Sequence, residues 1–382
     1  MEKIDATVII WGNDNYHVSG LLRQLSPYVS NVVFLVNNRK YHCATISKYC
    51  KHYQVVSGIN AGLEYLLDFG KSLNEKAFII TTSDLLAAAI DQNSKLLSPY
   101  YYLCTTKEQG ALTKVLNKNY QCEIAEQAGI HVPESKEFYW NSSIEGITYP
   151  CLIKPSFKVV GVHHPFKTMV CRTPDELICA QNSLDKQGTY TLQQLINKEK
   201  DILVYGCRLE DGSIIYAGSF IKYRWANNGD GSFGTISPDV PECINKEHLN
   251  SFMNKIEYYG LFSAEFGFEN NAAWFYEFNL RNDGTSHYFY QAFHVNLPLL
   301  WVKDHLGVFT WDRIENKHNA IFIDEINDID NVRAGRITKS EWRKDYRKAT
   351  VFKYYDRKDR KPYYYEKTKQ YLRELYHKIK RQ

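Results

Sequence analysis

The sequence lacks several features that would place it in other classes of protein. No apolar run is long enough to span a bilayer, and residues 1–5 lack the basic and apolar regions of a signal peptide. We therefore expect a soluble chain that stays in the cytoplasm. The nine cysteines are scattered and never occur as Cys-x-x-Cys, which argues against a disulfide framework and a zinc site. No Ser-His-Asp or Cys-His constellation stands out either.

Composition and charge are ordinary, but the charge is unevenly spread. A chain of 382 residues with 44% hydrophobic and 24% charged residues can form two or three packed units. The net charge is +4, and residues 343–382 carry fifteen Lys and Arg against five Asp and Glu. The first 342 residues are therefore at −6. Any electrostatic attraction to a partner belongs to the C-terminal tail.

The first hundred residues alternate between apolar runs and helical patterns. Strands are predicted at 6–12, 31–36, 53–56 and 76–81, with helices at 18–25, 45–50 and 61–69. Alternation with short connections predicts a parallel, doubly wound sheet. Residues 12–17 do not match Gly-x-Gly-x-x-Gly, so nicotinamide-cofactor binding is not supported. Asn13, Asp14 and Asp84 would lie at the carboxyl ends of strands, where they either contact substrate or cap helices.

Residues 273–281 carry the strongest chemical signal. Alternation along a strand puts Trp274, Tyr276 and Phe278 on one face and Phe275, Glu277, Asn279 and Arg281 on the other. A second strand at 261–268, joined by the turn 269–271, would bring Glu265 beside Glu277. Two such carboxylates repel unless a cation lies between them, and hard oxygen ligands suit Mg²⁺. The alternative is a half-buried hairpin whose polar face meets water.

Lysines recur at positions that favour an anion. Lys154 ends the apolar strand 149–155, where a buried ammonium is costly without an anion to meet. The loop 156–166 follows, and Lys167 begins the returning strand 167–170. Lys118 precedes a helix that ends at Gly129, with Lys114 one turn earlier as its rival. Farther on, Lys222 and Arg224 flank the glycine-rich loop 227–235 and suit an acceptor carboxylate or acyl phosphate, or else a solvated surface hairpin.

The C-terminal residues predict an amphipathic basic helix. Apolar residues recur at helical spacing, namely Tyr365, Thr368, Leu372, Leu375 and Ile379, among many lysines and arginines. Either this helix docks on the body with its charges in water, or it is attracted to anionic lipid or a lipid-linked phosphorylated acceptor. No nucleic-acid-binding motif is present, so we expect no nucleic-acid partner.

Taken in order, these motifs resemble the ATP-grasp superfamily, and they look most like its D-aspartate ligase and carbamoyl-phosphate-synthetase-like branch. The resemblance covers roughly residues 5–310. It implies an α/β fold with a Rossmann-like pre-ATP-grasp domain (1–112), a small ATP-grasp subdomain with the phosphate loop (113–192), a large subdomain with the metal site (193–310) and a basic helical extension (311–382). The last segment would lie outside the ATP-binding core. The phosphate loop here departs from the glycine-rich form of many relatives, with Gly161 as its one glycine.

The resemblance also implies roles for individual residues. The expected metal ligands are Glu265, Glu277 and Asn279. The expected nucleotide contacts are Lys118, Lys154 and Lys167 for the phosphates and Gln193, Gln194, Leu195 and Ile196 for the adenine. The expected catalytic residues are Arg281, Lys154, Lys222 and Arg224. Gln194 stands where relatives often carry Glu.

The implied reaction is ADP-forming ligation of a carboxylate to an amine, with ATP and Mg²⁺, or Mn²⁺ in its place. Family resemblance suggests an amino acid joined to a peptidoglycan precursor or surface polysaccharide, placing the chain in the cytoplasm or at the inner membrane face. The residues leave the oligomeric state open, with a dimer as one alternative. The other functions to weigh are a catalytically weak ATP-binding protein and a membrane-docked scaffold in an envelope polysaccharide pathway.

Overall fold

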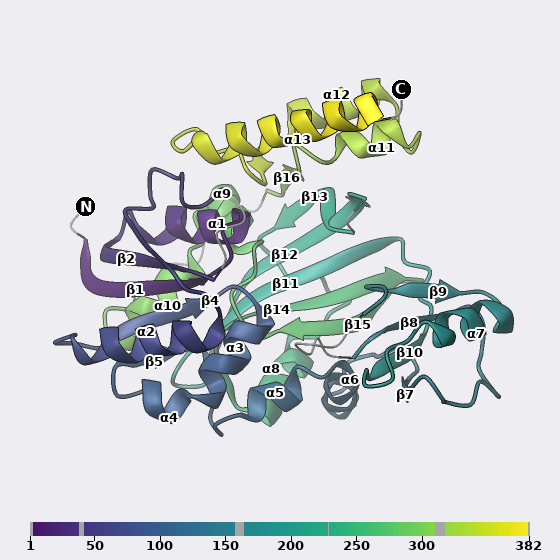
Figure 1. Ribbon diagram of the computed structural model, residues 1–382, viewed down its shortest axis with the longest axis horizontal. Helices are drawn as coiled ribbons and strands as arrows, with labels where there is room; N and C mark the ends of the chain where they lie inside the picture. Colours follow the sequence, from purple (N-terminus) through teal and green to yellow (C-terminus); the bar gives the residue numbers. More distant parts are fainter. Residues whose placement is uncertain (1–2, 38–41, 157–163, 228, 310–317, 381–382) are drawn as a thin grey trace.

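Three β-sheets organise the part of the chain that the structure describes. We describe a computed structural model of residues 3–37, 42–156, 164–227, 229–309 and 318–380. A five-stranded sheet comes first, a four-stranded sheet follows, and an eight-stranded sheet takes up most of the second half (Figure 1). Among the described residues, no helix is both long and apolar enough to cross a membrane.

The N-terminal sheet is parallel, as the alternating pattern predicts. Its strand order is β3-β2-β1-β4-β5. The strands are β1 (Ile4–Gly12), β2 (Val29–Val36), β3 (His52–Val55), β4 (Ala77–Thr81) and β5 (Tyr101–Leu103), and the helices are α1 (Tyr16–Leu25), α2 (Ile59–Lys71), α3 (Asp84–Gln92) and α4 (Ser94–Leu97). The side chain of Asn15 caps α1 by accepting from the backbone of His17 and Val18.

The helix predicted at 45–50 is wrong, because the chain makes turns there. Asp14 is fully buried and its carboxylate accepts bonds from the backbone N–H groups of Ala44 (2.5 Å) and Thr45 (3.1 Å). A buried acceptor pins these N–H groups in a turn and withdraws them from a helix. Asp14 therefore holds this turn, and it is not among the described residues that line the main cavity of the molecule, of about 850 Å³.

The four-stranded sheet forms a smaller unit with its own core. Its order is β7-β10-β8-β9, and its pairs are antiparallel. Its elements and those leading into it are β6 (Thr105–Thr106), α5 (Ala111–Val115), α6 (Lys118–Gln127), β7 (Ser135–Phe138), β8 (Cys151–Pro155), β9 (Met169–Cys171), α7 (Pro174–Asn182) and β10 (Tyr190–Gln194). Thr173 accepts from the backbone of Glu176 and caps α7 ahead of Pro174.

The eight-stranded sheet supplies the floor of the molecule's main cavity. Its order is β15-β14-β11-β12-β13-β16-β17, with β6 paired to β14. The elements are β11 (Lys200–Arg208), β12 (Ile214–Trp225), β13 (Gly231–Ser237), α8 (Lys246–Ile256), β14 (Tyr258–Glu269), β15 (Ala272–Asn279), α9 (Ser286–Phe293), α10 (Leu297–His305) and β16 (Ala320–Ile323). One continuous apolar core joins this sheet to the N-terminal sheet, which fixes the two together.

Strict alternation along β15 fails at one point. Glu265 pairs with Glu277, but the next residue of β14, Phe266, pairs with Phe275, so Tyr276 is an extra residue. The bulge puts Phe275 and Phe278 in the core together, with ring centroids 5.4 Å apart. The predicted grouping of Phe275 with Glu277 is therefore wrong.

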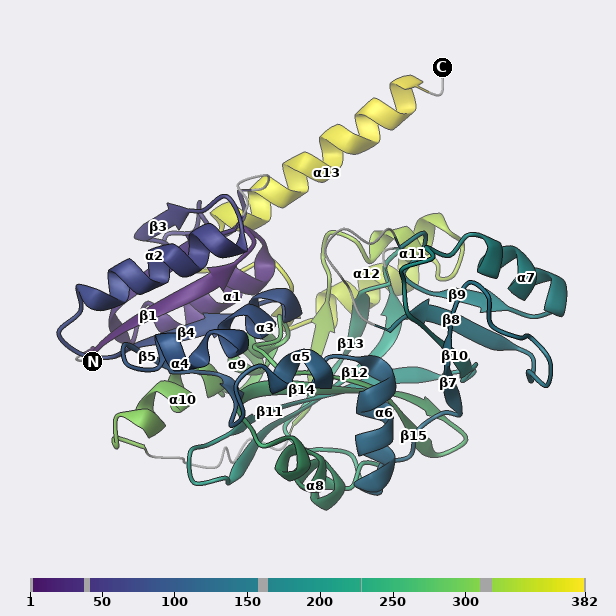
Figure 2. The same ribbon diagram turned by 60° about the horizontal axis from the view of Figure 1, so that its bottom comes forward.

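The C-terminal segment belongs to the body of the molecule more than predicted. Its elements are α11 (Ile329–Arg333), α12 (Lys339–Lys348), β17 (Val351–Phe352) and α13 (Lys361–Lys380). Both β16 and β17 extend the eight-stranded sheet, with β17 parallel to β16. The buried Asp359 accepts from Arg23 and Ser47 of the N-terminal sheet's unit. The predicted C-terminal helix is present as α13 and runs away from the body (Figure 2).

Candidate active site

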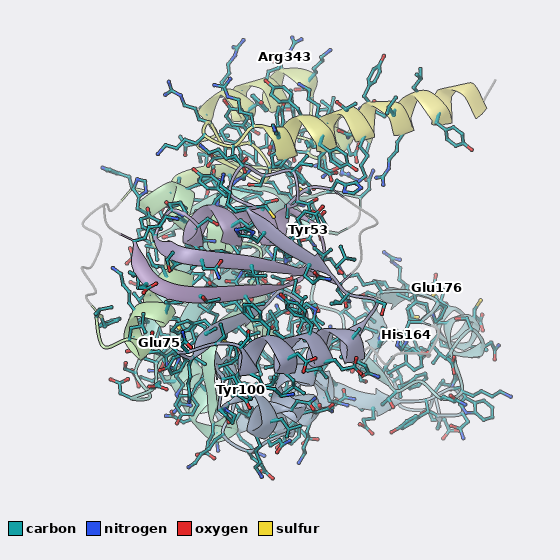
Figure 3. All side chains as sticks on the ribbon, turned by 60° about the vertical axis from the view of Figure 1, so that its left-hand side comes forward. Tyr53, Glu75, Tyr100, His164, Glu176 and Arg343 are labelled. Carbon is teal, nitrogen blue, oxygen red and sulfur yellow. The ribbon has the colours of Figure 1, made fainter. Side chains whose placement is uncertain are left out.

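A cavity of about 850 Å³ lies where the three sheets meet. The strands β12, β14 and β15 line it with charged side chains, α6 contributes Lys118 and Gln121, and the first residues of α1 and α3 line it from the N-terminal unit. His164, which follows the undescribed residues 157–163, borders the cavity from the small unit, and Figure 3 shows it where the N-terminal and four-stranded units approach each other. The cavity is large enough for a nucleotide and a second small molecule.

Two facing carboxylates form the centre of this cavity. Glu265 and Glu277 are direct cross-strand partners on β14 and β15, as the sequence predicts. Each is paired with its own lysine: Glu277 lies 2.6 Å from Lys118 and Glu265 lies 3.2 Å from Lys222. The hairpin therefore holds two acids side by side between two cations.

The two acids differ in pKa because their surroundings differ. Burial opposes ionisation of Glu277, but Lys118, Lys154 and Arg281 outweigh it and lower its pKa to about 2. Burial raises the pKa of Glu265, which Lys222 opposes and the charge of Glu277 reinforces. A cation placed between the acids would relieve this repulsion.

The donor set fits a magnesium ion. Two carboxylates and an amide oxygen are hard ligands, and Mg²⁺ commonly takes one or two carboxylates and leaves its other positions to water and phosphate. Asn279 lies beside these acids: its Nδ2 is 3.4 Å from Glu265 Oε1, and its Oδ1 accepts from Arg281 at 2.9 Å. Among the described residues, no group of three or more His, Cys, Asp or Glu is placed to hold a metal.

Lysines approach the acids from the small unit. Lys118, and not its rival Lys114, lines the cavity; the Lys114 ammonium instead lies 4.2 Å from the ring centroid of Tyr120. Lys154 is 8% exposed at the end of β8, where Pro155 and Ser156 line the cavity. Burial, reinforced by the charge of Lys118, lowers the pKa of Lys154 to about 8. Such a lysine is costly to keep charged, and an incoming polyanion offsets that cost.

The predicted adenine-reading residues lie at the end of β10 and just after it. Gln193 is buried, its Oε1 accepts from Lys154 at 3.0 Å, and among the described residues its Nε2 has no partner. Gln194 is exposed, the N–H of Leu195 donates to Pro150, and Ile196 is buried. None of the four lines the 850 Å³ cavity among its described walls, so their contact with adenine stays a prediction.

Lys167 lines the cavity and is exposed, just ahead of β9. The preceding loop is predicted to cover phosphate, but residues 157–163, with His163, lie outside the described residues. Its last part is described, and His164, Pro165 and Phe166 line the cavity with Lys167.

Arg281 is held in place at the end of β15. It bonds Asp84 of the N-terminal unit at 2.7 Å and Asn279 Oδ1 at 2.9 Å, and lies 3.5 Å from Asp283. Burial disfavours its charge, but Asp84 and Asp283 outweigh it and raise its pKa. The network ties a cation of the large sheet to the N-terminal unit across the cavity.

The two basic residues of β12, Lys222 and Arg224, lie in different surroundings. Lys222 lines the cavity; burial opposes its charge, but Glu265, Asp201 and Asp283 together raise its pKa. Arg224 is not among the described residues that line the cavity. It pairs with Asp328 at 2.8 Å and Asp345 at 2.6 Å, and its guanidinium lies over the ring of Phe233. The catalytic role predicted for Arg224 remains a prediction, and its contacts are those of a structural anchor.

Sequence reasoning missed three residues at the inner end of the cavity. Tyr16 and His17 are the first two residues of α1, and Lys353 comes from the C-terminal segment. Lys353 is buried, 3.0 Å from Asp324 and 3.3 Å from Asp230, with its ammonium 4.4 Å from the ring centroid of Tyr16. It directly follows β17, an apolar strand of two residues, which is too short a pattern to stand out in the sequence. The C-terminal segment thus reaches the cavity, and its predicted place outside the core is wrong.

Solved structures share this fold. The N5-carboxyaminoimidazole synthetase of Staphylococcus aureus in complex with ADP superposes with a TM-score of 0.66 at 16% identity, covering 88% of this chain and 86% of that one. The L-amino acid ligase from Bacillus licheniformis gives 0.60 at 13% identity, covering 80% and 75%. These are ATP-grasp structures. The chain has the ATP-grasp fold.

A third structure with the ATP-grasp fold was solved with magnesium. It is the biotin carboxylase domain of the 2-oxoglutarate carboxylase from Hydrogenobacter thermophilus, a dimer in complex with MgADP and bicarbonate, with a TM-score of 0.63 at 14% identity, covering 84% of this chain and 74% of that one. No protein-family model matches the chain, and no curated protein matches it.

Proposed function

We propose that the chain is a ligase that uses ATP and Mg²⁺ to join a carboxylate to an amine through an acyl phosphate. The observation that carries this proposal is the Glu265 and Glu277 pair, facing each other across two strands with a lysine on either side. The ATP-grasp fold and the S. aureus synthetase bound to ADP support a nucleotide in this cavity. The biotin carboxylase domain bound to MgADP supports magnesium at the acids.

The residues divide the work by position. Lys118, Lys154 and Lys167 would neutralise the triphosphate from the side of the small unit, and the Gln193 amide would bond the adenine. Mg²⁺ held by Glu265, Glu277 and Asn279 would offset charge between the β- and γ-phosphates. Lys118 and Lys222 would then release their carboxylates in part and turn their charge toward phosphate or acyl phosphate.

The reaction is two displacements. A carboxylate oxygen of the substrate attacks the γ-phosphorus, the bond to the β-phosphate oxygen breaks, and ADP leaves. The amine nitrogen then attacks the acyl carbon, inorganic phosphate leaves, and the nitrogen loses a proton to water. Arg281 would stabilise the transferring phosphoryl group. Such chemistry depends on positioning and charge neutralisation, which the buried ionic network supplies.

The acceptor end is the part that gives the chain its specificity. Tyr16, His17 and Lys353 surround the inner end of the cavity, with Asp230 and Asp283 near them. Burial lowers the pKa of His17 to about 4, so its imidazole is neutral at pH 7 and suits hydrogen bonding. Carboxylates beside a lysine can bind both the ammonium and the carboxylate of an amino acid, and this supports an amino-acid substrate.

The order of motifs, which resembles the D-aspartate ligase branch, supports a peptidoglycan precursor or cell-surface polysaccharide as the other partner. Such acceptors can be lipid-linked, so this part of the proposal also places the chain in the cytoplasm at the inner membrane face. Mn²⁺ can replace Mg²⁺ at oxygen ligands. A dimer is compatible with the proposal.

Phosphate release from Mg-ATP tests the proposal directly. Each amino acid of a panel is incubated with and without amine acceptors, and wild type is compared with Glu277→Gln, which keeps the size of the side chain and removes its charge. The proposal expects release that depends on one carboxylate and one amine, lost in the variant. Nucleotide binding without release on any pair would support the alternative of an ATP-binding protein without catalysis.

The scaffold alternative is tested by truncation. Removing residues 361–382 deletes α13 and keeps Lys353 and the sheet strands. A ligase keeps its turnover of small substrates after this truncation. A scaffold that acts by docking loses its function while the cavity is intact.

A further inference from the structure

The C-terminal helix α13 turns an apolar face to solvent. Its exposed apolar residues and their exposed fractions are Tyr364 (55%), Tyr371 (65%), Leu372 (57%), Leu375 (43%) and Tyr376 (55%). Their successive spacings are seven, one, three and one residues, and at about 3.6 residues per turn these positions fall within one half of the helix surface. We call this side, together with Tyr365 and Thr368, the apolar face of α13. From Tyr371 onward these side chains are exposed, and in Figure 2 the helix runs out from the body; nearer the start of the helix, the ring centroid of Tyr365 lies 6.3 Å from that of His42.

The polar side of α13 faces the body instead. Glu366, Gln370 and Glu374 are spaced four residues apart and lie opposite the apolar face. Glu374 pairs with Arg333 of α11 at 2.8 Å. At the start of the helix Pro362 and Tyr363 are buried. An ordinary surface helix buries its apolar stripe and exposes its charges, so α13 is reversed, and a reversed helix indicates a surface built for a partner.

Basic residues border the apolar face on both sides. Lys367 lies along one border, with Lys369 and Arg373 along the other. A shallow groove of about 490 Å³ runs along the second border, lined by Tyr365, Thr368, Lys369, Leu372, Arg373 and Tyr376. Lys369 also pairs with Glu366 at 3.2 Å, and Lys367 donates to the hydroxyl of Tyr363 at 3.1 Å. The acidic residues of α13 stand on the opposite side.

This charge pattern selects among possible partners. A second copy of the helix would bring the same basic borders together, and they would repel each other. An anionic lipid surface complements them, because lysine and arginine stems lie along apolar surface while their charges reach the headgroups. Tyrosine is favoured at that depth, where its ring is buried and its hydroxyl stays wet. Residues 343–382 add an excess of ten positive charges around the helix, and Arg343 of α12 projects into solvent in Figure 3.

We propose that the apolar face of α13 binds in the plane of an anionic membrane surface. The helix is too polar to cross a bilayer, so it would lie in the interface with Leu372 and Leu375 among the acyl chains. The proposal deepens the membrane location of the proposed function, on which it rests. Its test reads lipid binding and not ATP consumption, so the two can fail separately.

Vesicle flotation with the full chain tests this surface. The probes are phosphatidylcholine vesicles with and without phosphatidylglycerol, at low and high salt. The decisive variant is Leu372→Glu, which puts a charge on the apolar face at an exposed position. Its matched control is Gln370→Glu, which adds the same charge on the opposite side of the same helix. ADP affinity and the thermal unfolding midpoint of each variant show whether the body is intact.

We expect wild type to float with the phosphatidylglycerol vesicles, to be released by salt, and to bind phosphatidylcholine alone weakly. Leu372→Glu should weaken binding by about tenfold or more, the equivalent of losing one buried leucine side chain. Gln370→Glu should stay within about twofold of wild type, since it leaves the apolar face intact. Absence of flotation in wild type overturns the proposal. So does equal loss in both variants, or a dimer in solution that Leu372→Glu dissociates, because the face would then bind a second copy.

Discussion

Lys154 is the residue whose replacement should raise stability and lower activity at the same time. In the free protein its ammonium is buried at the end of β8, and burial with the nearby charge of Lys118 lowers its pKa from 10.5 to about 8. At about 1.4 kcal/mol per pH unit, holding the charge costs about 3 kcal/mol of folding free energy at pH 7. Replacement by methionine, of similar length, removes that cost. It also leaves the buried Oε1 of Gln193 without its donor, which costs about 1 to 2 kcal/mol.

Lys154→Met should therefore stabilise the ligand-free protein at pH 7 by about 1 to 2 kcal/mol and lower turnover by about 10²- to 10³-fold, since a preorganised charge is lost. The direction of the pH dependence follows from the number of protons bound by the folded and the unfolded protein. Between pH 8 and 10.5 the unfolded lysine keeps its proton while the folded one releases it, so wild-type stability rises there. The advantage of the variant should shrink over that range.

Urea unfolding at pH 7 and pH 10 measures the stability of each protein, and repeating it with ADP shows whether the nucleotide still binds. Lys154→Arg is the control, because it keeps a charge at the site. If Lys154→Met is less stable than wild type at pH 7, or if it binds ADP as tightly as wild type, the account of this lysine is refuted.

Three further outcomes follow from the ionic contacts. Arg224→Leu should lower the unfolding free energy by about 3 kcal/mol, because it leaves the fully buried Asp328 without its cation. The ADP affinity of the folded fraction should be unchanged. Loss of turnover without loss of stability would instead make Arg224 catalytic. Lys353→Gln should raise the KM for the carboxylate or amine substrate by about tenfold in steady-state kinetics and leave the ADP affinity unchanged. A change confined to ADP binding would contradict the assignment of Lys353 to the acceptor end of the cavity. ADP binding near pH 8 should take up protons at Lys154, measured by calorimetry in buffers of different ionisation heat, and binding without proton uptake would argue against phosphate contact there.

The sequence was most informative where chemistry restricts the residue type. A lysine ending a buried strand and two acids on neighbouring strands are costly arrangements, so Lys154 and the Glu265 and Glu277 pair could be identified from the residue pattern alone. The parallel N-terminal sheet followed from the alternation of apolar runs and helical patterns. The strand register could not be predicted fully, because a bulge at Tyr276 depends on how Phe275 and Phe278 pack against α8 and not on local preference.

The other misses have a common cause. Asp14 accepts bonds from residues thirty positions away, and Lys353 reaches the cavity through a strand pair that is short in both members. Such long-range contacts leave little trace in local pattern. The exposed side of α13 could not be decided either, because an amphipathic pattern shows that two faces differ and not which one meets the body.

The central claim is that Glu265 and Glu277 bind magnesium against a nucleotide held by lysines. Calorimetric titration of ADP, with and without Mg²⁺, into wild type and Glu277→Gln tests it without any knowledge of the substrates. We expect Mg²⁺ to tighten ADP binding to wild type by about tenfold or more and to have little effect on the variant. ADP affinity that responds equally to Mg²⁺ in both proteins, or no ADP binding by wild type, would contradict the claim.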